Sequence, residues 1–145
     1  MTTTVSRTVR TRTPLERCWA YLSDFSNAAQ WDPGTVSCRR VDAGPDGVGA
    51  EYENTSTFQG RETTLRYRVI TFEPGGRLVL EGENSTVKSV DDMTFSGDET
   101  GTEVVYSAHF TFKGLAKLAG PMLTKPLNDL ADDAQAGLQL ALDAL

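Results

Sequence analysis

The chain has 145 residues and carries 20 acidic against 14 basic side chains, a net charge of −6. This length predicts one domain, residues 1–145, with a substantial core, and the negative charge disfavours binding to nucleic acid or to anionic lipid surfaces. The polar start carries no signal-peptide pattern, and no apolar run reaches the roughly 20 residues of a membrane span. We therefore expect a cytoplasmic protein without an integral membrane segment. Cys18 and Cys38 are too few and too distant for a disulfide framework.

The first third of the chain predicts one strand and two short helices. Residues 5–12 alternate in polarity, which is typical of a strand. Thr13-Pro14-Leu15-Glu16 then predicts a capping box with proline at the first helical position. The apolar stripe of that helix is Leu15, Cys18, Trp19, Leu22 and Phe25. A second short helix is expected over 28–31, and the turn Asp32-Pro33-Gly34 ends it.

The middle of the chain predicts an antiparallel meander. Turn residues recur about every ten positions and separate six strand candidates, at 36–42, 49–58, 62–73, 77–82, 86–96 and 102–112. In the third of these the apolar period moves from one face to the other, from Leu65, Tyr67 and Val69 to Ile70 and Phe72. Such a switch predicts a bulge or a strong bend.

The last stretch predicts a long amphipathic helix from Pro126 to Leu145. Its apolar residues recur at steps of three and four: Leu127, Leu130, Ala134, Leu138, Ala141 and Leu145. The apolar face of this helix, which is roughly 30 Å long, must pack against other residues, and the meander can cover it. The fold class is therefore α+β, a curved antiparallel sheet of about seven strands around a long C-terminal helix. Pro121 and Pro126 should interrupt the approach, so we interpret 115–125 as a gate.

Several short motifs resemble those of a known family when taken in this order. They are Thr13-Pro14-Leu15-Glu16-Arg17-Cys18-Trp19, Leu22-Ser23-Asp24-Phe25, Trp31-Asp32-Pro33-Gly34, Gly47-Val48-Gly49, Phe72-Glu73-Pro74 with Arg77-Leu78, and Gly101-Thr102-Glu103-Val104 with Tyr106. With the terminal helix, they make the chain resemble the START-like helix-grip (SRPBCC) superfamily, in its bacterial polyketide cyclase/dehydrase-like branch. The resemblance implies an apolar cavity between sheet and helix, but members differ in activity.

The sequence offers no convincing catalytic constellation. His109 is the only histidine, so a multi-histidine metal site is excluded, and its strand period places it opposite Tyr106, Ala108 and Phe110. No Gly-x-Ser-x-Gly motif is present, and Cys18 lies on an apolar helix face. Arg7 could meet a ligand carboxylate, an acidic side chain or solvent. We expect no cofactor and no metal, and we assign no catalytic residue.

The candidate ligand-binding residues are polar or apolar groups that could face the cavity. Trp31 matches the family's tryptophan after the first helix, a position that implies pocket lining, although packing between helix and sheet is the alternative. For each tyrosine the alternative is an ordinary core aromatic. The small Ala134 and Gly137 should leave most room along the helix wall. The predicted residues are Trp31, Tyr52, Asn54, Tyr67, Leu80, Tyr106, Phe110, Met122, Leu127, Leu130 and Ala134.

Three functions remain open from the sequence. The first is binding of a small hydrophobic ligand, such as a lipid, a polyketide or an aromatic metabolite, in the cavity. The second is a polyketide aromatase/cyclase or dehydratase-like enzyme in which Tyr67, Tyr106 or Arg7 donates protons. The third is a protein-interaction module that uses Asp129, Asp132 and Asp133.

Overall fold

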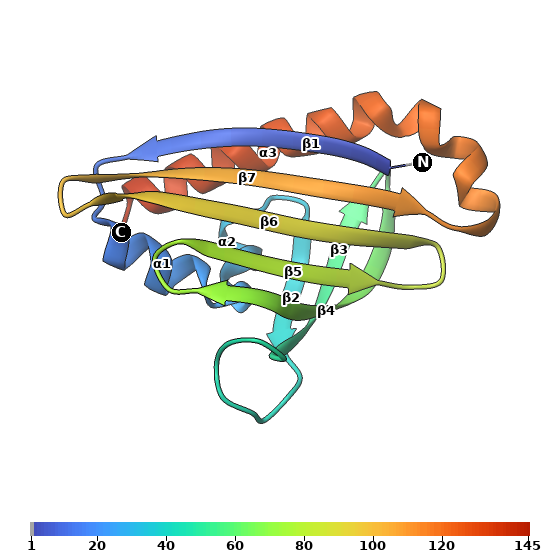
Figure 1. The fold of residues 1–145 in the computed structure, drawn as a ribbon. Coiled ribbons are helices and arrows are strands. Elements are labelled where there is room, and N and C mark those ends of the chain that lie inside the picture. The colour runs from blue at the N-terminus through green and yellow to red at the C-terminus, as the bar shows by residue number, and fades with distance from the viewer. Residues whose placement is uncertain (1) are drawn as a thin grey trace.

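The computed structural model describes residues 2–145. Seven antiparallel strands form one curved sheet in the order β1-β7-β6-β5-β4-β3-β2, which confirms the predicted architecture (Figure 1). Their bounds are β1 Thr2–Thr11, β2 Thr35–Arg40, β3 Glu51–Phe58, β4 Arg61–Glu73, β5 Arg77–Glu83, β6 Val87–Asp98 and β7 Gly101–Phe112. Because β1 pairs with β7, the first strand of the chain forms one edge and β2 forms the other.

The helices lie in two groups. After β1 come α1 Leu15–Leu22, the 3-10 turn η1 Phe25–Asn27 and α2 Ala28–Trp31. After β7 come the 3-10 segment η2 Gly114–Leu123 and the long helix α3 Thr124–Asp143, which runs along the sheet behind β1 and β7 in Figure 1. Within residues 2–145, no helix is both long and apolar enough to cross a membrane.

Helix α3 covers the otherwise open edge of the sheet at β1. Its buried residues are Leu127, Ala131, Ala134, Leu138 and Leu142. The side-chain amides of Gln135 and Gln139 donate to the backbone carbonyls of Thr8 and Arg10 at 2.9 and 2.8 Å. These bonds satisfy carbonyl groups that β7 cannot reach, and so they protect an edge strand from pairing with another chain.

Two details of the helix ends differ from the sequence prediction. Helix α1 has no side-chain cap, because the Thr13 hydroxyl donates to the carbonyl of Leu142 at 2.6 Å. The capping-box prediction is therefore wrong, and Thr13 instead ties β1 to the end of α3. Helix α3 begins at Thr124, so Pro126 lies in its first turn, where its missing N–H removes no intrahelical bond.

Gly137 is a packing residue and does not widen the cavity as we expected. A Cβ at this position would lie 2.0 Å from the Trp31 carbonyl oxygen and 3.1 Å from Pro33 Cδ. The missing side chain allows α3 to approach the end of α2 closely. This close approach helps to place the Trp31 ring beneath the sheet.

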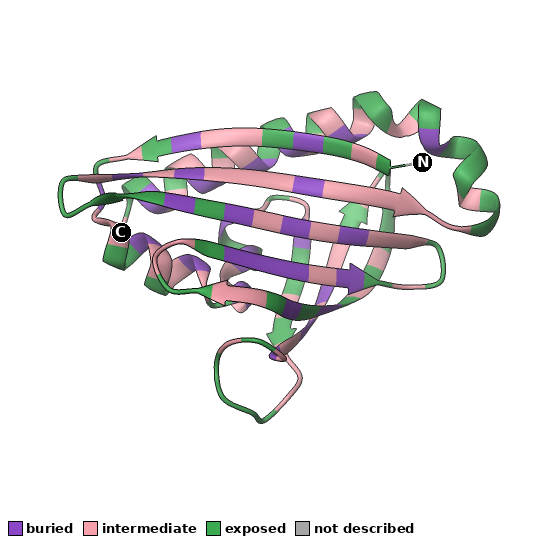
Figure 2. Cartoon of the chain, viewed as in Figure 1, coloured by how far each residue is buried: buried purple, intermediate pink, exposed green. Residues whose placement is uncertain are grey.

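The core divides into a large cluster beneath α1, α2 and the C-terminal half of α3, and a small one beneath the N-terminal half of α3. The small cluster contains only Val5, Ala108, Leu127 and Ala131 as fully buried residues, and Figure 2 shows that burial falls off along α3 toward η2. The predicted bulge in β4 is confirmed by a register shift between Val69 and Thr71 against β5.

Candidate functional site

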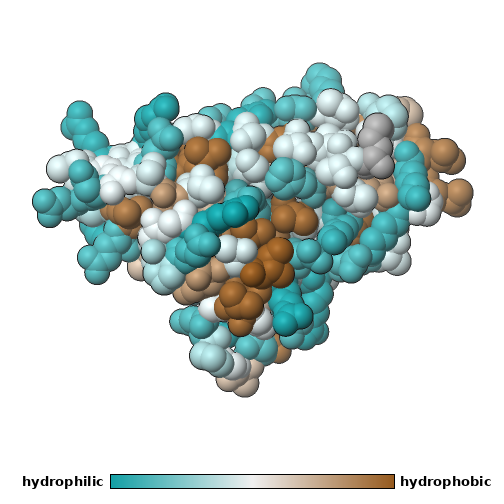
Figure 3. Space-filling model, in the orientation of Figure 1, coloured by the Kyte–Doolittle hydropathy of each residue, from teal (hydrophilic) through white to brown (hydrophobic). Residues whose placement is uncertain are grey.

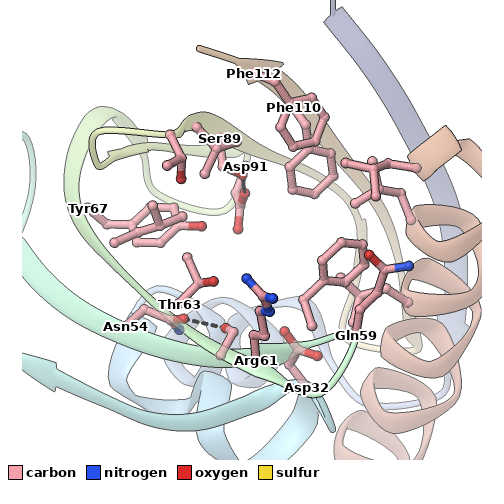
Figure 4. Close-up of a pocket in the computed structure, with 18 of the residues that line it drawn as sticks. Asp32, Asn54, Gln59, Arg61, Thr63, Tyr67, Ser89, Asp91, Phe110 and Phe112 are labelled. Carbon is pink, nitrogen blue, oxygen red and sulfur yellow. Dashed lines mark hydrogen bonds between the residues drawn. The ribbon is translucent and has the colours of Figure 1, made fainter. Parts of the chain in front are cut away.

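A cavity of about 560 Å³ lies where the curved sheet, η2 and the start of α3 diverge. This volume falls in the range of pockets that hold small organic ligands, about 300–1,000 Å³. Its walls come from η1, α2, β3, β4, β6, β7, η2 and α3, and Figure 4 shows many of the side chains that face it. Most of the apolar lining is contributed by Phe25, Ala28, Trp31, Phe58, Leu65, Phe110, Phe112, Leu123, Leu127 and Leu130.

Seven of the eleven predicted residues line this cavity: Trp31, Asn54, Tyr67, Tyr106, Phe110, Leu127 and Leu130. The rings of Trp31 and Tyr106 meet edge to face with centroids 5.8 Å apart. The Asn54 amide is held by two neighbours, because its Oδ1 accepts from the Ser56 hydroxyl at 2.7 Å and its Nδ2 donates to Thr35 Oγ1 at 3.4 Å. Whether these residues bind a ligand stays a prediction.

The other four predicted residues lie outside the cavity. Tyr52 packs against Phe25 in the core, with ring centroids 5.7 Å apart, and Leu80 is fully buried in the large core cluster. Ala134 faces β1 one to two turns beyond the cavity wall, near Arg7 and Val9. Met122 is 79% exposed, because η2 directs Ala119 and Leu123 inward in its place.

Asp91 is the most unusual group in the cavity, and the sequence prediction missed it. The residue is only 5% exposed, and its oxygens accept from the Ser89 hydroxyl at 3.0 Å and the Tyr106 hydroxyl at 3.3 Å. Burial raises the pKa of Asp91 to about 7, although both hydrogen bonds favour the charged form. A signal was present, since Asp91 alternates with Ser89, Met93 and Phe95 on one face of its strand.

A second carboxyl, Asp32, lines the same cavity next to Trp31. Its oxygens accept from the Gly34 amide at 3.0 Å and the Thr35 hydroxyl at 3.1 Å, which fixes the turn after α2. Burial raises the pKa of Asp32, and the negative charge of Asp32 in turn contributes to the raised pKa of Asp91. The sequence prediction treated Asp32 only as a turn residue, whereas its side chain both fixes the turn and lines the cavity.

The tip of the β3–β4 hairpin forms one rim of the cavity. Gln59 and Gly60 connect the strands with φ of 52° and 77°, the left-handed conformations of a two-residue type I′ turn. Phe58, Gln59 and Arg61 all line the cavity at this rim. Arg61 is exposed, and its guanidinium is joined by no ion pair in residues 2–145.

The opposite rim is η2, which has two apolar faces. Ala116, Ala119 and Leu123 point into the cavity, whereas Leu115, Leu118 and Met122 are 86%, 79% and 79% exposed. Figure 3 shows apolar side chains at the end of the molecule that η2 occupies. The prediction that this segment acts as a gate is compatible with its position and remains untested.

Several residues considered for chemistry lie away from the cavity. His109 Nδ1 bonds Thr4 Oγ1 at 2.9 Å, on the face of β7 opposite Tyr106. The Arg7 guanidinium pairs with Asp132 at 2.9 Å. Of the three partners considered for Arg7 from the sequence, the structure therefore shows an acidic side chain. Cys18 is fully buried, as its apolar helix face predicted, and burial raises the pKa of its thiol. Burial also raises the pKa of the Cys38 thiol, to about 11, which leaves it un-ionised at neutral pH. No cluster of metal-ligating side chains occurs in the described part of the chain.

The cavity lining therefore has two chemical parts. Most of it is aromatic and aliphatic, and its polar end, as we call it, consists of Asp91, Tyr106, Tyr67, Ser89 and, near enough for its charge to act on Asp91, Asp32. Burial also raises the pKa of both tyrosines well above its ordinary value, so they stay protonated at neutral pH. The arrangement can hold an apolar molecule, orient one polar group, and exchange a proton near pH 7 through Asp91.

Comparisons with solved structures show that the fold is shared with other proteins. The structure is similar to the Zhui aromatase/cyclase from Streptomyces sp. R1128, with TM-score 0.82, 15% identity and coverage of 99% and 94% of the two chains. It is also similar to a START superfamily protein from Mycobacterium smegmatis, with TM-score 0.81, 17% identity and coverage of 97% of both chains. The di-domain ARO/CYC BexL matches with TM-score 0.71 and 14% identity over 95% of this chain and 49% of its own.

These identities indicate a shared fold, and a search of curated protein sequences gives no significant match. The sequence does match one family model, described as polyketide cyclase / dehydrase and lipid transport, over residues 2–143. That match covers almost all of the chain. The helix-grip fold is shared with these structures, and the protein belongs to the polyketide cyclase/dehydrase and lipid transport family.

Proposed function

We propose that the protein binds a small, mainly apolar molecule that carries at least one polar group, in the cavity between sheet and α3. The observation that supports this most is the 560 Å³ cavity, whose apolar walls end at a cluster of buried polar side chains. Burial of ligand surface would stabilise the complex by about 25 cal/mol per Å². The polar cluster would fix the orientation of the ligand.

Occlusion of the cavity tests this proposal. Thr63 lines the cavity from β4, and its neighbour Thr64 points to the exposed face of the same strand. Thr63→Trp should abolish the fluorescence increase of the neutral probe N-phenyl-naphthylamine, and Thr64→Trp, the matched control, should leave it unchanged. Equal titration curves for both variants and for the wild type would contradict the proposal, because the probe would then bind elsewhere.

Native mass spectrometry of freshly purified protein provides an independent measurement. We expect a co-purified small molecule on the wild type that is absent from Thr63→Trp. The mass of this molecule would identify the ligand class directly. Identical bound masses on both proteins would indicate binding outside the cavity.

A second candidate function, an aromatase/cyclase or dehydratase-like enzyme, is favoured by one observation. Asp91 is a buried carboxyl with a pKa of about 7, in contact with the Tyr106 hydroxyl at 3.3 Å. Such a carboxyl can, at neutral pH, take a proton from the carbon next to a carbonyl as the carbonyl enolises, and it can later return that proton. Under this alternative, Asp91→Asn and Tyr106→Phe should change the product distribution from a reactive poly-β-ketone. A distribution equal to spontaneous cyclisation with the wild type would reject it.

A further inference from the structure

We propose that the ligand carries a basic nitrogen, and that its ammonium group lies between Asp91 and Asp32 at the polar end of the cavity. This inference rests on the proposed ligand-binding function and names the chemical class of the ligand. It follows from the hydrogen-bonding capacity that the cavity leaves open, from the charge of its polar end and from its aromatic walls.

The polar end of the cavity offers more acceptors than free donors, and within residues 2–145 the Tyr67 hydroxyl is the one donor of this end that has no assigned partner. The hydroxyl groups of Ser89 and Tyr106 both donate to Asp91. The Ser56 hydroxyl likewise donates to Asn54 Oδ1 at 2.7 Å. A carboxylate has about four lone-pair sites, so Asp91 can accept further bonds after these two. A ligand group that donates several hydrogen bonds, as an ammonium does, complements this end.

No protein cation balances the two carboxyl groups. Neither Asp91 nor Asp32 belongs to any ion pair within residues 2–145. The basic group on the cavity lining is Arg61: its guanidinium points into the cavity from the rim (Figure 4), but it is exposed, forms no ion pair with Asp91 or Asp32, and is not among the groups that shift the pKa of either acid. A buried carboxylate is stable only when it is paired. A ligand cation would supply the missing partner, and the charge of Arg61 favours the inner end for it.

The walls around the carboxyl groups are aromatic. Trp31, Tyr67 and Tyr106 all line this part of the cavity, and Tyr67 is only 6% exposed while its hydroxyl points into the open space beside Asp91 (Figure 4). Aromatic faces attract cations through the ring quadrupole, and most strongly where water is excluded. Carboxylates and aromatic rings together recognise an alkylammonium better than a neutral carbonyl.

Three probes with one ring system and different polar groups test the inference: naphthylmethylamine, naphthalenemethanol and naphthoic acid. Isothermal titration calorimetry with the wild type at pH 8 should show the affinity falling in the order amine, alcohol, acid. The amine should bind about tenfold more tightly than the alcohol. Asp91→Asn should remove this preference, so that the variant binds the amine and the alcohol within about threefold of each other. Asp92→Asn, the control, removes a carboxyl that points away from the cavity toward Arg77 and should preserve it.

Acidification should act in the same direction as Asp91→Asn. The groups that face Asp91 are Asp32, Tyr67, Tyr106 and, more distantly, Cys38, and of these only the carboxyl groups ionise below neutral pH. As the pH falls from 8 through about 7 to 5, Asp91 becomes protonated. The affinity for the amine should therefore fall relative to that for the alcohol, and amine binding at pH 7 should release a fraction of a proton.

The outcomes separate this inference from the function on which it rests. Suppose that naphthalenemethanol and N-phenyl-naphthylamine bind in the cavity. The proposal of a basic ligand is then overturned if naphthylmethylamine binds no more tightly than naphthalenemethanol, or if naphthoic acid binds best. If none of these probes binds the wild type, both proposals fail. The comparison of probes on the wild type needs no variant, so it holds even if Asp91→Asn does not fold.

Discussion

Asp91 should lower the stability of the ligand-free protein at neutral and alkaline pH, and Asp91→Asn should therefore stabilise it. The pKa of this carboxyl rises from 3.8 to about 7 in the folded state. Each pKa unit corresponds to about 1.36 kcal/mol, so the shift of about three units amounts to roughly 4 kcal/mol. Asn keeps the shape of the side chain: its Oδ1 can accept from one of the two hydroxyls and its Nδ2 can donate to the oxygen of the other, and it carries no charge to bury.

The sign follows from which state holds the proton. Below pH 3.8 both states are protonated, and Asp91 makes no contribution. Between 3.8 and about 7 the folded state keeps the proton that the unfolded state has lost, so the stability falls as the pH rises. Above about 7 both states are ionised, and the penalty is complete. Asp91→Asn should thus match the wild type near pH 4 and exceed it by up to about 4 kcal/mol at pH 8.

Urea unfolding followed by circular dichroism at a series of pH values measures this difference. The difference between variant and wild type is the relevant quantity, because other carboxyls contribute opposite slopes. The Arg40 guanidinium, for example, lowers the pKa of Asp42. Asp92→Asn serves as the control for loss of a charge. A stability difference that is the same at pH 4 and pH 8, or a variant no more stable than the wild type at pH 8, would refute the reasoning.

Four further predictions concern packing, electrostatics, turn geometry and mobility. Gly137→Ala should cost about 2–4 kcal/mol of unfolding free energy, since its Cβ would meet the Trp31 carbonyl; an unchanged urea midpoint would contradict this. Tyr106→Phe should raise the pKa of Asp91 in a carbon-13 NMR titration by removing a hydrogen bond to the charged form, so a lower value would be inconsistent. Gln59→Asn should stabilise the hairpin by about 0.5 kcal/mol because Asn tolerates a positive φ, and a lower thermal midpoint would argue against the I′ turn. Amide exchange in η2 should be faster than in β6 and β7 if it is the gate, and equal protection would exclude that role.

The sequence predicted the elements of the fold because each leaves a local signature. Alternation in 102–112 predicted β7, and the spacing after Pro126 predicted most of α3. The bulge near Ile70 was visible because an added residue reverses the period of the strand. The capping box was a local pattern as well, but the Thr13 hydroxyl found a partner 129 residues away, and no local rule anticipates such a bond.

The site was predicted less completely, for reasons of geometry. Strand alternation gave the inward face of Tyr67 and Tyr106, but it could not tell which inward residues end in the core and which reach the cavity. Tyr52 and Leu80 point inward as well, and they are covered by α1, η1 and neighbouring strands. Asp91 was missed because a carboxyl in a strand is ordinarily solvent-exposed, whereas the burial of Asp91 depends on tertiary structure.

The burial of Asp91 connects the stability of the protein with its ligand. An asparagine at this position could still hydrogen-bond both hydroxyls, accepting from one and donating to the other, and it would avoid the cost of ionisation. A group that lowers the stability of the empty protein is typical of sites that have a function. A ligand cation that pairs with Asp91 would offset this cost and lower its pKa, so a bound amine should flatten the dependence of stability on pH that Asp91 creates. A neutral ligand that accepts a hydrogen bond from the protonated carboxyl would instead steepen it. The pH profile of stability with bound ligand therefore distinguishes the two kinds of ligand without any substitution.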